Sequence, residues 1–216
     1  NYFLGFGNDI SDEVSVYLGV EYFEFGYESR YDAGRNGLNV IGSAGNSSAG
    51  YRDNTAFFVE GLYTPEAVEG LEVSVSARQD DYSDFGSAST SKIGAAYDIT
   101  DELFVRASIG DSFIPADMTS LYGAPAESFQ FATDFTSCRA TGIADADCPE
   151  RQYASFLVSN ANLQPETSDS INMGVVWSPS FMAGNQSFSL DYYEITFEDL
   201  QTRITLQGLI NAELSG

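Results

Sequence analysis

The side chains that most often carry out catalysis are scarce in this chain. Histidine is absent, and it is both the commonest general base and the commonest transition-metal ligand. Serine is plentiful, but there is no histidine to activate a serine nucleophile. Glu198 and Asp199 resemble a glycosidase pair, yet adjacent residues of a strand point to opposite faces, whereas such acids must flank one bond. The sequence therefore predicts no catalytic residue and no enzyme.

Acidic residues dominate the charge. The 216 residues hold 32 acidic and 9 basic side chains, which gives a net charge of −23. This balance argues against nucleic acid as a partner, because its phosphates need basic groups. Asp80, Asp81 and Asp84 are close in sequence and carry oxygen ligands that calcium prefers, but the spacing of a calcium loop is missing. We interpret them as a solvated hairpin tip and expect no metal and no cofactor.

The two cysteines lie close together. Cys138 and Cys148 fall within one long polar stretch, and two cysteines alone do not make a zinc site. A local disulfide formed in an oxidising compartment is the better interpretation. Such a bond would stabilise its short loop by roughly 2–3 kcal/mol.

Alternating polarity is the main secondary-structure signal. In residues 13–22 the side chains Val14, Val16, Leu18, Val20 and Tyr22 occupy one face of an extended chain. About ten residues of a tilted strand cross a bilayer. Similar alternation recurs at 71–78, 92–99, 103–110 and 187–192.

The basic residues in these segments fall on the polar face. A cation that faces lipid at the midplane costs about 2–4 kcal/mol. We therefore expect Lys92 and Arg106 to face a water-filled lumen, and Arg106 to pair with an acid on a neighbouring strand. A soluble β-sandwich shows the same alternation, so the distinction depends on strand length and on the connections.

The connections alternate between short and long. About eight strand-like segments are joined by short links near 8–12, 64–70, 98–102 and 178–186, by long polar links at 26–51 and 112–167, and by a smaller one at 80–90. This asymmetry is typical of an antiparallel transmembrane β-barrel with tight periplasmic turns and long extracellular loops. The mean hydropathy of −0.15 is compatible with a barrel, because only every second residue meets lipid.

The segment 112–167 is far longer than an ordinary connection, and such loops are usually functional or disordered. Its aromatic side chains could stack on sugars or flat ligands, or pack within the loop. The aromatic residues that we select as ligand-facing candidates are Phe113, Tyr122, Phe129, Phe131 and Tyr153.

Four segments in order resemble the barrel of TonB-dependent outer-membrane receptors. They are Arg78-Gln79-Asp80-Asp81-Tyr82-Ser83-Asp84-Phe85-Gly86-Ser87, residues 103–110 with Phe113 and Leu121-Tyr122-Gly123, Asn160-Ala161-Asn162-Leu163-Gln164-Pro165-Glu166-Thr167-Ser168 followed by Trp177-Ser178-Pro179, and Asp191-Tyr192-Tyr193 with Ile195. Two positions depart from the family pattern. Phe113-Ile114-Pro115-Ala116 stands where Phe-Arg-Ala-Pro is common, and Ala161 replaces a proline.

The resemblance implies that residues 1–216 are about eight strands of a larger barrel, of about 22 strands in outer-membrane transporters. It also implies an N-terminal plug domain, absent from this sequence, through which the TonB complex drives nutrient uptake. The implied setting is the outer membrane of a Gram-negative bacterium, with outer-membrane lipid around the barrel. The implied ligand is a ferric siderophore, haem, cobalamin or an oligosaccharide.

Two alternatives remain open. One is a small standalone barrel with a structural or adhesive role, and the other is an outer-membrane hydrolase barrel. We interpret the chain as an internal fragment, because it begins within a strand and ends in a polar stretch without a closing strand. The missing histidine argues against the hydrolase.

Overall fold

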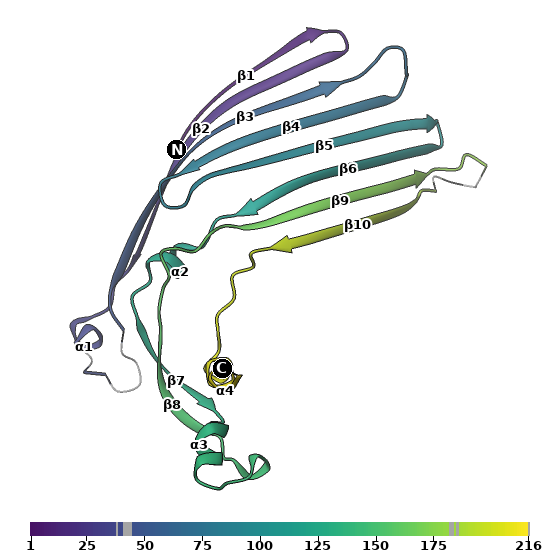
Figure 1. Ribbon diagram of the computed structural model, residues 1–216. Helices are drawn as coiled ribbons and strands as arrows, with labels where there is room; N and C mark the ends of the chain where they lie inside the picture. Colours follow the sequence, from purple (N-terminus) through teal and green to yellow (C-terminus); the bar gives the residue numbers. More distant parts are fainter. Residues whose placement is uncertain (38, 41–44, 182–183, 185, 216) are drawn as a thin grey trace. The chain divides into compact units, whose positions relative to one another are not determined.

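A computed structural model describes residues 1–37, 39–40, 45–181, 184 and 186–215. Eight strands form one sheet in the order β1-β2-β3-β4-β5-β6-β9-β10, and Figure 1 shows them side by side between β1 and β10. Their bounds are β1 Tyr2–Ser11, β2 Val14–Ser29, β3 Ser48–Tyr63, β4 Leu71–Tyr82, β5 Gly86–Thr100, β6 Leu103–Ile114, β9 Glu166–Trp177 and β10 Phe188–Glu198. The partial, antiparallel, all-β barrel wall expected from the sequence is confirmed by this sheet.

The register gives the sheet two chemically different faces. Val75, Ile93, Ile109 and Ile171 are directly opposite one another across β4, β5, β6 and β9, and all four are exposed. Residues opposite each other in antiparallel strands share a face. The neighbouring positions therefore form the other face, where Ser76, Lys92, Gly110 and Ser170 are aligned in the same way. We call these the apolar face and the polar face.

The short links are where the sequence indicated, and one of the polar links is shorter than expected. Two residues join β1 to β2 and two join β5 to β6. The polar link expected over 80–90 is confined to residues 83–85, because β4 continues to Tyr82 and β5 begins at Gly86. The acids of this segment have partners within the sheet, as the pairing of Asp80 with Arg78 shows, so they do not need a solvated loop.

The long connections fold together. Residues 26–50, 117–163 and 201–216 make one compact unit, which we call the loop unit, and the remaining residues make the sheet unit. The loop unit contains α1 Ala33–Asn36, α2 Met118–Tyr122, β7 Ala126–Ala132, α3 Phe135–Ala140, the 3-10 turn η1 Asp145–Asp147, β8 Arg151–Leu157 and α4 Leu206–Ser215. The β7–β8 hairpin is antiparallel. Among the described helices, none has both the length and the apolar character needed to cross a membrane.

Two glycines offer a matched test of the turns. Gly70, in the β3–β4 link, has φ +80°, and a Cβ added there would be 2.9 Å from the Cβ of Asp98. Gly86, at the start of β5, has φ +91°, and no described atom would be within 4 Å of its added Cβ. Alanine at either position meets the left-handed penalty of about 1–2 kcal/mol.

We therefore expect Gly70→Ala to destabilise the folded protein more than Gly86→Ala, because only the first adds a steric overlap. Urea unfolding of the whole protein in detergent measures the difference. Equal losses of unfolding free energy would contradict the close approach of Gly70 to Asp98.

Candidate functional site

An ionic network centred on the buried Asp80 ties three strands together on the polar face. Arg78 of β4 donates to both carboxylate oxygens of Asp80, at 2.9 and 3.0 Å, and to Glu21 Oε2 of β2 at 2.9 Å. Asn54 of β3 donates from Nδ2 to Asp80 Oδ1 at 2.7 Å. Asp80 is only 2% exposed, so these donors compensate the cost of burying its charge. Asn54 Oδ1 is a buried acceptor with no hydrogen-bond partner in the described part of the chain.

A second buried pair lies at the β4–β5 turn. Arg52 Nε donates to Asp84 Oδ2 at 2.8 Å, and Arg52 Nη2 donates to the carbonyl oxygen of Ala116 at 3.0 Å. The side chains of Arg52 and Asp84 are 5% and 9% exposed. The guanidinium carbon is 5.4 Å from the ring centre of Tyr82 and 5.6 Å from that of Phe85. Because arginines engage Asp80 and Asp84, the acidic segment is not arranged as a calcium site.

Both basic residues selected from the sequence lie on the polar face. Arg106 Nη2 is 2.6 Å from Asp191 Oδ1, and these residues are directly opposite Gly174, which separates them on β9. The acid is thus one strand beyond the expected neighbour. A Cβ on Gly174 would be 2.3 Å from Asp191 Oδ1, so glycine leaves room for the pair to cross the strand. Lys92 makes no ion pair with any residue that the structure describes.

Two of the aromatic candidates pack against neighbouring residues of their own unit. The ring of Phe113 lies 6.0 Å from Tyr82 and 6.4 Å from Phe85 in the sheet unit, measured between ring centres. In the loop unit, Tyr122 lies against the backbone of Gly50, where an added Cβ would be 2.3 Å from its ring. Both side chains are half-buried, and these contacts give them a packing role.

The remaining aromatic candidates lie on opposite faces of the β7–β8 hairpin. Phe129 and Phe131 share one face with Phe156, and their exposures are 39%, 63% and 64%. We call these three residues the phenylalanine face. Tyr153 is opposite Gln130 on the other face and is half-buried. Phe156 was not selected from the sequence, because its alignment with Phe129 and Phe131 depends on the register between β7 and β8.

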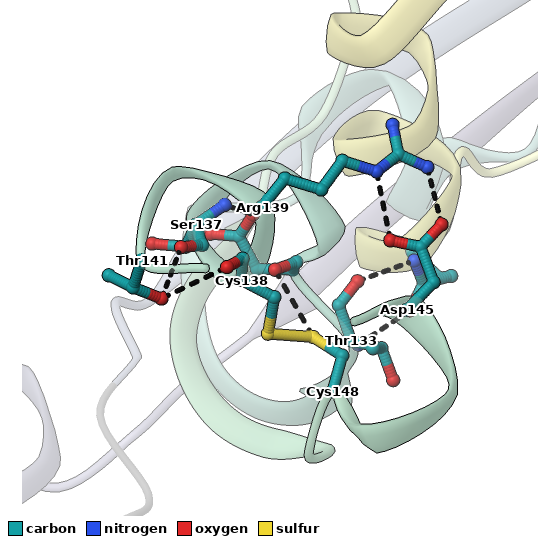
Figure 2. The surroundings of a disulfide bond; sticks show 9 residues. Thr133, Ser137, Cys138, Arg139, Thr141, Asp145 and Cys148 are labelled. Atoms are coloured by element: carbon teal, nitrogen blue, oxygen red, sulfur yellow. Dashed lines mark hydrogen bonds and ion pairs between the residues drawn. A yellow bond between two sulfur atoms is a disulfide. The ribbon is translucent and has the colours of Figure 1, made fainter. Parts of the chain in front are cut away.

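The disulfide lies in the same loop. Figure 2 shows Cys138 of α3 joined to Cys148, with the side chain of Arg139 bonded to Asp145 beside it. Arg139 donates from Nε and Nη2 to the two oxygens of Asp145, at 2.9 and 2.6 Å. Hydrogen bonding to the Arg139 guanidinium lowers the pKa of Asp145 below its ordinary value. A covalent bond and a two-point ion pair therefore close the same stretch of chain.

Comparison with known proteins identifies the family. The family model described as TonB dependent receptor-like, beta-barrel matches residues 1–213. The chain therefore belongs to the TonB-dependent receptor β-barrel family, and the resemblance found in its motifs is confirmed. No curated protein sequence matches the chain.

Solved structures share the fold. A mutant of the ferric enterobactin receptor PfeA from Pseudomonas aeruginosa, in complex with enterobactin, aligns with a TM-score of 0.64 at 17% identity over 91% of this chain and 26% of that chain. The siderophore receptor PirA from Acinetobacter baumannii gives 0.63 at 14% identity, over 92% and 27%. The RagAB peptide transporter gives 0.51 at 16% identity, over 92% and 23%. The present chain thus spans about a quarter of these proteins.

Removing the arginine of a buried ion pair should lower the free energy of unfolding more than removing the arginine of a half-exposed pair. Arg52→Met would leave Asp84 buried without its cation, which costs about 3–5 kcal/mol. Arg106→Met breaks a half-exposed pair, worth about 0–1 kcal/mol. Urea unfolding of the two variants measures this difference. Equal destabilisation would contradict the burial assigned to the Arg52–Asp84 pair.

The ion pair beside the disulfide predicts a pH dependence. The folded-state pKa of Asp145 is lowered. The pair therefore stabilises the loop at pH values above the unfolded-state pKa of Asp145, and this stabilisation is lost as the pH falls through the folded-state pKa. Arg139→Gln should raise the pKa of Asp145 toward its ordinary value, as measured by NMR titration of the carboxyl carbon. An unchanged pKa in this variant would exclude Arg139 as the cause.

Proposed function

We propose that this chain forms part of the wall and the outer loops of an outer-membrane receptor, which imports a scarce nutrient with energy delivered by TonB. The observation that carries the proposal is the single-layer sheet with one apolar and one polar face. Exposed apolar surface of this extent normally marks contact with another apolar medium, and in a barrel wall that medium is lipid.

The distribution of charge supports the same orientation. Arg78, Lys92 and Arg106 all lie on the polar face, where a water-filled lumen would solvate them. The same cations on the lipid side would each cost about 2–4 kcal/mol near the midplane. The proposed setting is therefore the outer membrane of a Gram-negative bacterium, with the apolar face in contact with lipid.

The loop unit is the proposed site of nutrient capture. The phenylalanine face offers exposed rings, and aromatic rings suit flat or apolar ligand groups. Phe129 and Phe131 remain our ligand-facing candidates and Phe156 joins them, whereas Phe113, Tyr122 and Tyr153 support the surrounding structure. A ferric siderophore is the first ligand to test, because PfeA and PirA, which share the fold, are siderophore receptors. Haem, cobalamin and oligosaccharides follow.

TonB would act through a plug domain, as the family resemblance implies. The barrel wall then holds the plug, and the ion pairs on the polar face fix the wall against which it lies. In this proposal the barrel wall catalyses no reaction, so we propose a transport protein and not an enzyme.

The function is tested by uptake of radiolabelled ferric enterobactin, haem and cobalamin into cells that carry the whole protein, with and without TonB. We expect uptake of one of these ligands to require TonB. The double variant Phe129→Ala/Phe131→Ala should reduce that uptake about tenfold or more, because stacked aromatic contacts contribute about 0.5–1.5 kcal/mol each beyond the area they bury.

The control is Phe181→Ala, since Phe181 is also exposed but belongs to the short link between β9 and β10. It should leave uptake unchanged. Uptake that does not need TonB would contradict the proposal, and hydrolysis of esters or glycans by the purified protein would favour the enzyme alternative.

A further inference from the structure

The segment that follows β10 is attached to the β7–β8 hairpin mainly through the side chain of Gln207. Gln207 of α4 accepts at Oε1 from the backbone nitrogen of Thr133 at 2.7 Å, and its Nε2 donates to the carbonyl oxygen of Thr133 at 3.0 Å. The side-chain amide thus pairs with both main-chain groups of one residue, as a strand neighbour would. Thr133 directly follows β7, so this pairing continues the hairpin's hydrogen bonding into α4.

Neighbouring contacts fix the geometry of this attachment. The backbone nitrogen of Leu206 donates to Gln130 Oε1 at 3.4 Å. Gln207 Nε2 also donates to Asn211 Oδ1, one helical turn later, at 3.0 Å, which orients the amide. Because Gln130 lies on the hairpin face opposite the phenylalanine face, α4 supports the hairpin from behind and leaves the three phenylalanines free.

We propose that Gln207 is a positioning residue, which holds the β7–β8 hairpin so that the phenylalanine face is presented in one orientation. The part of this inference that concerns ligand capture rests on the function proposed above. The part that concerns the order of the hairpin does not depend on any ligand.

The chemistry of the contact explains why glutamine is needed. A side-chain amide carries an acceptor oxygen and a donor nitrogen on one planar group, which matches the carbonyl and N–H of a main-chain residue. Glutamate would keep the acceptor for the Thr133 nitrogen but would place a carboxylate against the Thr133 carbonyl. Methionine has nearly the same helix propensity as glutamine and removes both hydrogen bonds.

The experiment is hydrogen–deuterium exchange of the whole protein in detergent micelles without ligand, followed by mass spectrometry. In Gln207→Met, amides of 126–133 and 151–157 should exchange about tenfold faster than in the wild type, because both hydrogen bonds between Gln207 and Thr133 are lost. The matched control Asn211→Ala removes only the orienting contact and should change these rates less than about twofold.

A second variant adds a readout that general destabilisation would not give. Gln207→Glu should resemble the methionine variant at neutral pH. Below about pH 4, where its carboxyl is protonated, it regains a donor, and its exchange relative to the wild type at the same pH should recover. Hairpin exchange that is unchanged in Gln207→Met, or that fails to recover in Gln207→Glu, would overturn the inference.

The two proposals can fail separately. If Gln207→Met loosens the hairpin while the phenylalanine substitutions leave uptake unchanged, the positioning role is supported and the ligand role of the phenylalanine face is contradicted. If the hairpin keeps its protection in Gln207→Met while Phe129→Ala/Phe131→Ala abolishes uptake, Gln207 has no positioning role and the proposed function stands.

Discussion

The neutralisation of each arginine on the polar face is the interaction on which the sheet depends. Arg78 connects β4 to β2, Arg106 connects β6 to β10, and Arg52 connects β3 to the β4–β5 turn. Each pair joins elements that are not consecutive in the chain, so it adds lateral order to a layer that otherwise relies on backbone pairing. It also keeps these arginine charges on one face, so that no cation of these pairs has to meet an apolar medium on the other.

Small residues make this arrangement possible. Gly174 lets the side chains of Arg106 and Asp191 meet above β9. Gly19 has a comparable role on β2, where an added Cβ would be 2.2 Å from the ring of Phe58. On the polar face, a glycine therefore leaves the space that side chains of the neighbouring strands need to reach across its strand.

The sequence predicted the sheet better than the loop unit, for physical reasons. Alternating polarity reports directly which face a residue occupies, and it correctly assigned Lys92 and Arg106 to the polar side. It could not reveal that Asp80 belongs to a strand, because the arginine that compensates its charge is recognised only from side-chain geometry. The alignment of Phe156 with Phe129 and Phe131, and the Gln207–Thr133 pairing, depend on long-range register, which a single sequence does not encode locally.

The decisive measurement is which medium each face of β6 meets. Single cysteines at Ser108 and Ile109, each carrying a spin label in the whole protein in bilayers, can be compared by their accessibility to oxygen and to a nickel chelate. If the apolar face meets lipid, the label at Ile109 is reached by oxygen in the bilayer and the label at Ser108 is reached by the water-soluble chelate. Equal accessibility at the two positions, or the reverse order, would contradict a barrel wall with a lipid-facing apolar surface.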